Sequence, residues 1–267
     1  MKTAILALLL ALLIGCAPKP GSDPHAGHPK DDKGQHGGHA AATLFVTAEP
    51  SPPVAGRPAA LKLMVHGAGG EMLKEFAVAH EQKVHLMVIR EGLDQFAHLH
   101  PEVDADGNIT VRHTFPAGGT YRLFADYQPA GGSAAVAATE VKVSGDSPPA
   151  PALVPDVPGT VTGDGLTARV TADGAKAGAE ATVRFELTDM KGKPVTDLEP
   201  YMGATGHLVV VSADGKQYVH AHPTAGGGEK NVVSFQAHFP AAGVYKGWGQ
   251  FKRAGRVLVV PFVVQVG

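Results

Sequence analysis

A pattern of three histidines occurs twice in this chain of 267 residues. In each copy a histidine is followed thirteen residues later by a His-x-His-Pro segment. The members are His85, His98 and His100 in the first copy, and His207, His220 and His222 in the second. Imidazole is the commonest metal ligand in proteins and suits copper, zinc, nickel and iron. The repeated spacing therefore predicts metal binding, with copper as the first expectation and zinc as the alternative.

The spacing also predicts how three imidazoles come together. Residues i and i+2 of an extended backbone point to the same side, so each His-x-His pair can bind one ion. The first histidine of each copy begins an apolar segment that a short loop joins to the pair. A hairpin would bring it beside the pair, and three such ligands plus water or a fourth residue form a metal site. Because only neutral imidazole binds, the affinity should fall below about pH 6.5.

Aligning the two copies suggests the fourth ligand. His80 stands five residues before His85, and Met202 stands five residues before His207. Methionine favours Cu(I), whereas a further histidine favours Cu(II) or zinc. The chain has a single cysteine, Cys16, so a thiolate ligand and an internal disulfide are not expected.

The N-terminus has the features of a targeting segment. Lys2 precedes an apolar stretch, residues 3–14, that is too short for an ordinary membrane-spanning helix. The stretch ends in Leu-Ile-Gly-Cys, which resembles a bacterial lipobox and predicts lipidation of Cys16. Residues 1–16 are then a lipoprotein signal, and the mature protein is anchored to the membrane of a bacterial cell envelope, facing the periplasm or the exterior.

Residues 17–42 are rich in Pro, Gly, Asp, Lys and His, and they contain too few apolar side chains to offset the entropy of ordering. We expect a disordered, His-rich linker. It holds two His-x-x-His pairs, which could capture metal or serve only as part of a solvated tether. The four histidines are His25, His28, His36 and His39.

The remaining chain predicts an all-β protein. Short apolar or alternating segments are separated by turn residues, which is typical of tandem antiparallel β-sandwiches of the immunoglobulin or cupredoxin type. We place the first sandwich at 43–144, a proline-rich spacer at 145–159 and the second sandwich at 160–267. The expected strands are 61–65, 84–89, 109–115, 121–125 and 138–143, then 166–170, 181–187, 207–211, 232–239, 244–248 and 256–260.

A further repeated segment, Phe-Pro-x-x-Gly-x-Tyr, resembles the tyrosine corner of Greek-key sandwiches. Tyr121 and Tyr245 are therefore expected to be structural. Trp248 could flank a copper ion, but packing in the core or between the domains is the more usual role of such a residue. The net charge of −2 at pH 7 gives no reason to expect nucleic acid as a partner.

Residues 94–101 (DQFAHLHP) and 201–208 (YMGATGHL) carry a resemblance to exported bacterial proteins with paired His-x-His-Pro repeats. That family is similar to YtkA-like and cupredoxin-like immunoglobulin-type domains. The resemblance implies a β-sandwich outside the cytoplasm and a role in copper homeostasis. The expected partners are the metal ion, the membrane and a metal efflux or transfer protein.

Two alternatives stay open. The histidines could form a structural network that bonds backbone carbonyls, and the protein would then be a structural or adhesive module of the envelope. A weaker alternative is a metalloenzyme, because Gly92 and the first His-x-His pair echo a cupin motif. Glu102 comes too soon after the pair for that motif, and the second copy departs further, so we do not expect an enzyme.

Overall fold

The computed structural model describes residues 42–224 and 229–267, and residues 40–267 form one compact unit. The lipobox-like segment with Cys16 and the His-rich tail lie outside the described residues. Within the described ranges all regular structure is β-strand, and no helix there is long and apolar enough to cross a membrane.

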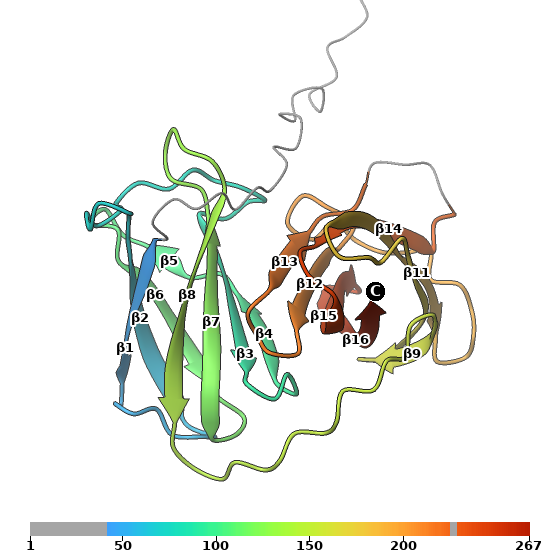
Figure 1. The fold of residues 1–267 in the computed structure, drawn as a ribbon, viewed down its shortest axis with the longest axis horizontal. Helices are drawn as coiled ribbons and strands as arrows, with labels where there is room; N and C mark the ends of the chain where they lie inside the picture. Colours follow the sequence, from blue (N-terminus) through green and yellow to red (C-terminus); the bar gives the residue numbers. More distant parts are fainter. Residues whose placement is uncertain (1–41, 225–228) are drawn as a thin grey trace, which may run out of the picture. The chain divides into compact units, whose positions relative to one another are not determined.

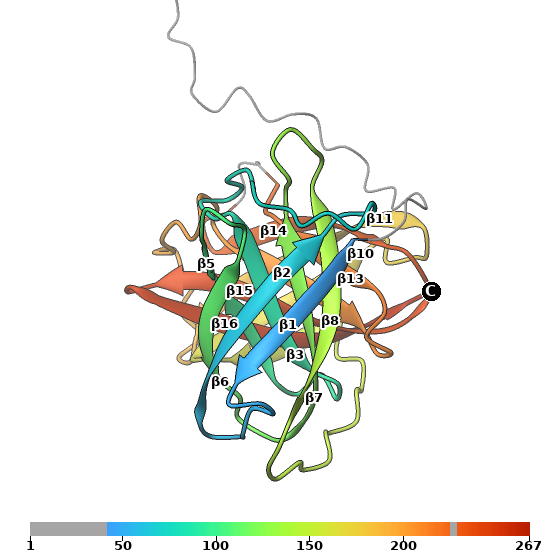
Figure 2. The same cartoon turned by 90° about the vertical axis from the view of Figure 1, so that its left-hand side faces the viewer.

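The first repeat contains strands β1 to β8 in two four-stranded antiparallel sheets (Figure 1). One sheet has the order β1-β2-β6-β5, and Figure 2 shows β1 and β2 side by side in it. Its strands are β1 (Thr43–Glu49), β2 (Pro58–His66), β5 (Glu102–Val103) and β6 (Ile109–Thr114). The other sheet has the order β4-β3-β7-β8. Its strands are β3 (Val84–Arg90), β4 (Phe96–Leu99), β7 (Gly119–Tyr127) and β8 (Ala135–Val143).

The second repeat contains strands β9 to β16, also in two four-stranded antiparallel sheets. Its first sheet has the order β14-β11-β10-β9. The strands are β9 (Gly159–Gly163), β10 (Leu166–Asp173), β11 (Ala179–Asp189) and β14 (Val232–Phe239). Its second sheet has the order β13-β12-β15-β16. The strands are β12 (His207–Ser212), β13 (Tyr218–Ala221), β15 (Gly243–Arg253) and β16 (Arg256–Val266).

Each repeat has its own hydrophobic core between its two sheets. In β2, Leu61, Leu63 and Val65 are buried, whereas the residues that alternate with them are more exposed. Such alternation of period two buries one face of a strand and leaves the other toward solvent. The expected pair of tandem β-sandwiches is therefore confirmed.

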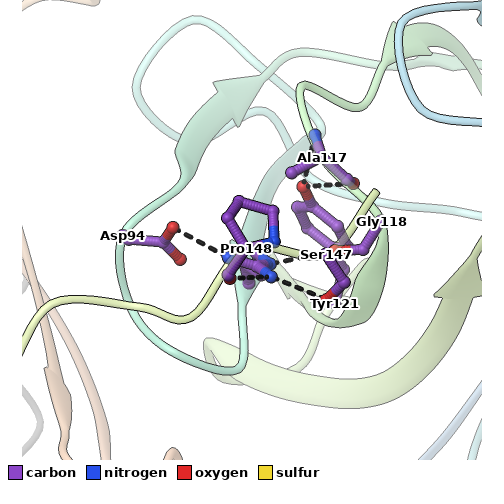
Figure 3. Close-up of polar contacts among 7 residues, drawn as sticks. Asp94, Ala117, Gly118, Tyr121, Ser147 and Pro148 are labelled. Atoms are coloured by element: carbon purple, nitrogen blue, oxygen red, sulfur yellow. Dashed lines mark hydrogen bonds and ion pairs between the residues drawn. The ribbon is translucent and has the colours of Figure 1, made fainter. Parts of the chain in front are cut away.

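The two tyrosines have the hydrogen bonds of a tyrosine corner. The Tyr121 hydroxyl donates a hydrogen bond of 2.9 Å to the carbonyl oxygen of Ala117 (Figure 3), and the Tyr245 hydroxyl donates one of 2.8 Å to that of Ala241. Both rings are buried. Each bond ties a core side chain to the loop before its strand, so the role is structural.

Arg90 joins the segment between the repeats to the first sandwich by hydrogen bonds. Its buried guanidinium donates to the carbonyl of Gly118 at 3.0 Å, to Ser147 Oγ at 2.8 Å and to the carbonyl of Pro148 at 2.7 Å. Asp94 balances the charge through an ion pair of 2.9 Å, as Figure 3 shows. A buried charge is tolerated in a protein interior when it is paired and hydrogen-bonded, as the Arg90 guanidinium is.

Strands β3 and β12 differ from the others because all their residues are buried. Leu86 and Val88 of β3 face the core of their own repeat. The residues that alternate with them, Met87 and Ile89, belong to a separate cluster that also holds Val209 of the second repeat. The sheet with β3 and the sheet with β12 therefore bury their second faces against each other.

Two aromatic stacks join the repeats at this interface. Phe96 stacks on Trp248 with ring centroids 4.6 Å apart, and Phe124 stacks on Tyr218 at 4.7 Å. Phe96 stands two residues before His98, as Tyr218 stands two residues before His220. Equivalent residues of the repeats thus make equivalent contacts, and Trp248 packs between the repeats.

Candidate metal centre

Sheet geometry places all six histidines of the repeated pattern at the interface. His85 is the second residue of β3 and His207 is the first residue of β12, and they lie on the same strand faces as Met87 and Val209. The hairpins β3–β4 and β12–β13 pair these strands with the ones that carry His98 and His220. The hairpin expected from the sequence is therefore present in both repeats.

Each hairpin brings together three histidines, and one ring nitrogen from each lies within 4.8 Å of those from the other two. The first histidine group consists of His85, His98 and His100, and the second histidine group consists of His207, His220 and His222. Either group could hold a metal ion.

Hydrogen bonds outside the first group determine which nitrogens carry protons. His85 Nε2 lies 3.1 Å from the carbonyl oxygen of Ala79, and His98 Nδ1 lies 3.1 Å from Gln250 Oε1. A carbonyl oxygen only accepts, so His85 Nε2 carries the proton, and with the Gln250 oxygen facing His98 the same holds for His98 Nδ1. The other nitrogen of each neutral ring then has a lone pair. Those two nitrogens, His85 Nδ1 and His98 Nε2, face each other at 3.0 Å.

The second group repeats this arrangement. His207 Nε2 donates to the carbonyl oxygen of Tyr201 at 3.0 Å, and His220 Nδ1 donates to Asp126 Oδ2 at 2.7 Å. The nitrogens left with lone pairs, His207 Nδ1 and His220 Nε2, are 3.3 Å apart.

Two lone pairs at these separations repel unless a cation lies between them. Nitrogens bound to one ion at about 2.0–2.1 Å are about 3.3 Å apart when the angle at the ion is tetrahedral. His100 Nε2 and His222 Nε2 are also buried and have no hydrogen-bond partner. Buried polar atoms are nearly always satisfied, so an ion would complete both groups.

Burial keeps these imidazoles neutral. Burial, together with the nearby ring of His85 and against the hydrogen bond to Tyr201, lowers the pKa of His207 from its usual 6.5 to about 4. Burial also lowers the pKa of His220, His98 and His222 well below the usual value. Neutral imidazole is the form that binds metal, so both groups are ready to do so at neutral pH.

The two groups touch across the interface. The ring centroids of His85 and His220 are 5.5 Å apart, and those of His98 and His207 are 5.9 Å apart. Two ions bound by adjacent rings would lie within about 12 Å of each other, because an ion lies about 3 Å from the centre of the ring that binds it. The histidines therefore form one cluster made by both repeats.

His80 and Met202 occupy equivalent two-residue turns, where both have a positive φ, 49° and 54°. Such backbone is uncommon for residues other than glycine and often marks a functional position. His80 stacks on His222 of the second repeat, with ring centroids 3.5 Å apart. Its ring centroid is 6.4 Å from that of His85, the residue beside which the alignment placed it. Met202 is buried in its turn, and ligation by either residue stays a prediction.

The sequence reasoning did not identify Asp126 and Gln250 as site residues. Asp126 pairs with His85 between β3 and β7, and Gln250 pairs with His207 between β12 and β15. Each then bonds a histidine of the other repeat, a contact that no local pattern indicates.

Fold and histidine groups define a protein of two tandem antiparallel β-sandwich domains with candidate metal sites. The chain belongs to the family described as a domain of unknown function, DUF8832, whose model matches residues 39–145 and 160–267. The internal repeat is therefore the same domain twice. No curated protein sequence matches the chain significantly.

Solved structures with some similarity include bacterial adhesins. The Escherichia coli adhesin FdeC is 17% identical over 84% of this chain and 64% of that chain, with a TM-score of 0.28. The integrin-binding protein invasin is 14% identical over 84% of this chain and 40% of its own, with a TM-score of 0.26. A carbohydrate-binding module of the β-sandwich superfamily is 11% identical, with 86% and 94% covered and a TM-score of 0.24. This chain spans less than two thirds of both adhesin chains, and scores this low carry no functional argument.

Proposed function

We propose that the protein binds metal ions through its two histidine groups and buffers, senses or transfers them in a bacterial envelope. The observation that supports this most strongly is in the second group, where the outer nitrogens of His207 and His220 both face oxygens that only accept. The nitrogens that face each other, His207 Nδ1 and His220 Nε2, then both carry lone pairs at a separation of 3.3 Å. A network that served only to hold the fold would place a proton between those nitrogens.

Copper is the ion that we propose first. Imidazole ligands suit both copper and zinc, and a given nitrogen site binds Cu(II) more tightly than Zn(II). Three histidines leave a coordination position open, which suits an ion that has to be taken up and released. Zinc is the alternative.

The location and the partners rest on the sequence. The lipobox-like segment supports a lipid anchor on Cys16, and a carrier at the membrane surface would exchange its ion with an efflux or transfer protein. We place the two domains at 43–144 and 160–267, with 17–42 as a His-rich linker and 145–159 as a spacer. We propose binding without catalysis.

Titration with Cu(I), Cu(II) and Zn(II) in competition with a chelator of known affinity tests this function. The protein used is the full chain with its four tail histidines replaced by asparagine, called here the tail variant. We expect it to bind tightly up to two ions. His100→Ala should abolish binding by the first group at little cost in stability, because His100 Nε2 has no hydrogen bond to lose.

The control is His238→Ala, which removes an exposed histidine outside both groups. It should leave both the stoichiometry and the affinity unchanged. If the tail variant binds no more metal than a generic protein surface, the proposed function is wrong.

The alternative, a structural or interaction module, is supported by the hydrogen bonds that four of the histidines make to backbone and side-chain oxygens. It predicts that histidine variants lose stability without any change in metal content. Metal titration of His100→Ala therefore separates the two functions, because this variant loses no hydrogen bond and only the metal-binding function predicts a change in it.

A further inference from the structure

We propose that the two histidine groups form one centre for two ions with unequal affinities, and that Asp126 makes the second group the first to fill. This inference rests on the proposed function and adds an order of loading to it. Asp126 acts as a positioning residue, because it touches a histidine and not the ion.

Neither group is complete within its own repeat. Gln250 of the second repeat fixes the outer nitrogen of His98, and Asp126 of the first repeat fixes the outer nitrogen of His220. Residues that hold the outer nitrogen of a histidine orient the ring and raise its basicity toward the metal. The residue that orients each group therefore belongs to the other repeat.

The two orienting residues are equivalent but differ in charge. Asp126 pairs with His85 in its sheet as Gln250 pairs with His207, so they occupy the same position of the repeat. An ionised carboxylate can only accept a hydrogen bond, whereas an amide can accept or donate. Asp126 therefore favours the metal-binding tautomer of His220, and Gln250 favours neither tautomer of His98 as strongly.

The charge of Asp126 also distinguishes the two groups. In the second group a carboxylate accepts from His220 at 2.7 Å, a distance typical of a charge-assisted hydrogen bond, and the amide contact to His98 is longer at 3.1 Å. His220 and Asp126 are both largely removed from solvent, with side-chain exposures of 4% and 22%. A negative charge held there attracts a cation more strongly than it would in water. The first group has a neutral residue in the same place.

The two groups are also close to each other. Because the two groups are in ring contact, an ion in one adds positive charge beside the other. The second ion therefore binds more weakly than the first. Repulsion and the difference between Asp126 and Gln250 act in the same direction, so the two affinities should differ by at least about tenfold.

Stepwise titration of the tail variant with Cu(II) and with Zn(II) tests the order of loading. We expect two resolved steps, the tighter of which is lost in His222→Ala and kept in His100→Ala. Asp126→Asn should weaken the tighter step by about 10–100-fold, the usual effect of losing a residue that orients a ligand. Asp126→Glu, which keeps the carboxylate, should restore most of the affinity.

Gln250→Glu is the matched variant in the other repeat and should tighten the weaker step. Electron paramagnetic resonance supplies a readout that a purely structural role would not move. One equivalent of Cu(II) should give the spectrum of a single isolated ion, and a second equivalent should broaden it by dipolar coupling.

Some outcomes would overturn this inference and leave the proposed function standing. These are two ions that bind with equal affinity, a tighter step that is lost in His100→Ala, or a tighter step unchanged in a folded Asp126→Asn protein. Circular dichroism of that variant establishes the fold. No metal binding in any form of the chain would overturn the proposed function itself, and this inference with it.

Discussion

His220 of the second repeat donates a hydrogen bond of 2.7 Å to Asp126 of the first repeat. The same bond therefore belongs to a candidate metal site and to the interface between the repeats. His98 of the first repeat makes the equivalent contact with Gln250 of the second repeat. Metal binding and the packing of the two domains should for this reason depend on each other.

Trp248→Ala tests that dependence. Trp248 is 4% exposed and stacks on Phe96, two residues along β15 from Gln250. Removing a buried aromatic ring should lower the free energy of unfolding by about 3–5 kcal/mol. The loosened interface should also weaken metal binding by the first group, which Gln250 orients. Urea unfolding and metal titration of the same variant measure both, and a large loss of stability with unchanged affinity would contradict the dependence.

The stability of the metal-free protein should fall as the pH is lowered. Burial lowers the pKa of His207 from 6.5 to about 4, so between these values the unfolded chain binds a proton that the folded protein does not. Stability is then complete above pH 6.5 and is lost toward pH 4, by about 3 kcal/mol for His207 alone.

The contribution of Asp126 to stability changes in the opposite direction as the pH falls. Burial raises the pKa of Asp126 to about 6, and protonation below that value favours the folded state. The histidines with lowered pKa outnumber this carboxyl, so the net change should be a loss. Urea unfolding with a chelator at pH 7.5 and at pH 5 measures it. Equal or greater stability at pH 5 would show that these imidazoles are not held neutral.

Metal affinity should persist to lower pH than the sequence alone predicts. Three ordinary imidazoles would lose about four orders of magnitude in affinity between pH 7.5 and pH 5, through competition with protons. Burial lowers the pKa of His207 to about 4, and the partners of His207 in its group have lowered pKa values as well. Protonation of Asp126, whose pKa burial raises to about 6, is then the main cost at pH 5, and we expect a loss of about 10–100-fold. Zinc titration at the two pH values checks this, and a thousandfold loss would contradict it.

The tyrosine corners should contribute to stability alone. Tyr121→Phe and Tyr245→Phe each remove one hydrogen bond to a loop carbonyl and keep the ring. Each should lower the free energy of unfolding by about 1 kcal/mol. The metal affinity should not change, and a change in it would mean that the corner also positions the histidines.

Much of this architecture could be predicted from residue patterns. Alternation and turn residues indicated most of the strands, and the i, i+2 spacing predicted that β4 and β13 are extended at their histidines. The Phe-Pro-x-x-Gly-x-Tyr segments predicted the bonds of Tyr121 and Tyr245. These features depend on residues that are near each other in the chain.

The interface could not be predicted in the same way. His98 and Gln250 are 152 residues apart, and neither local spacing nor composition reports a contact between repeats. The sequence does carry one signal of this interface. The runs at 84–89 and 207–211 are apolar without alternation, which is typical of strands buried on both faces. That signal would have indicated a partner for the second face of each sheet.

The central claim is that each histidine group holds an ion through three imidazoles. Anomalous X-ray diffraction from crystals of the copper-loaded tail variant measures this directly. Our account predicts a metal peak about 2.0–2.1 Å from His85 Nδ1, His98 Nε2 and His100 Nε2, and a second peak in the other group. Copper peaks only at other surface sites, or none at all in copper-loaded crystals, would contradict it.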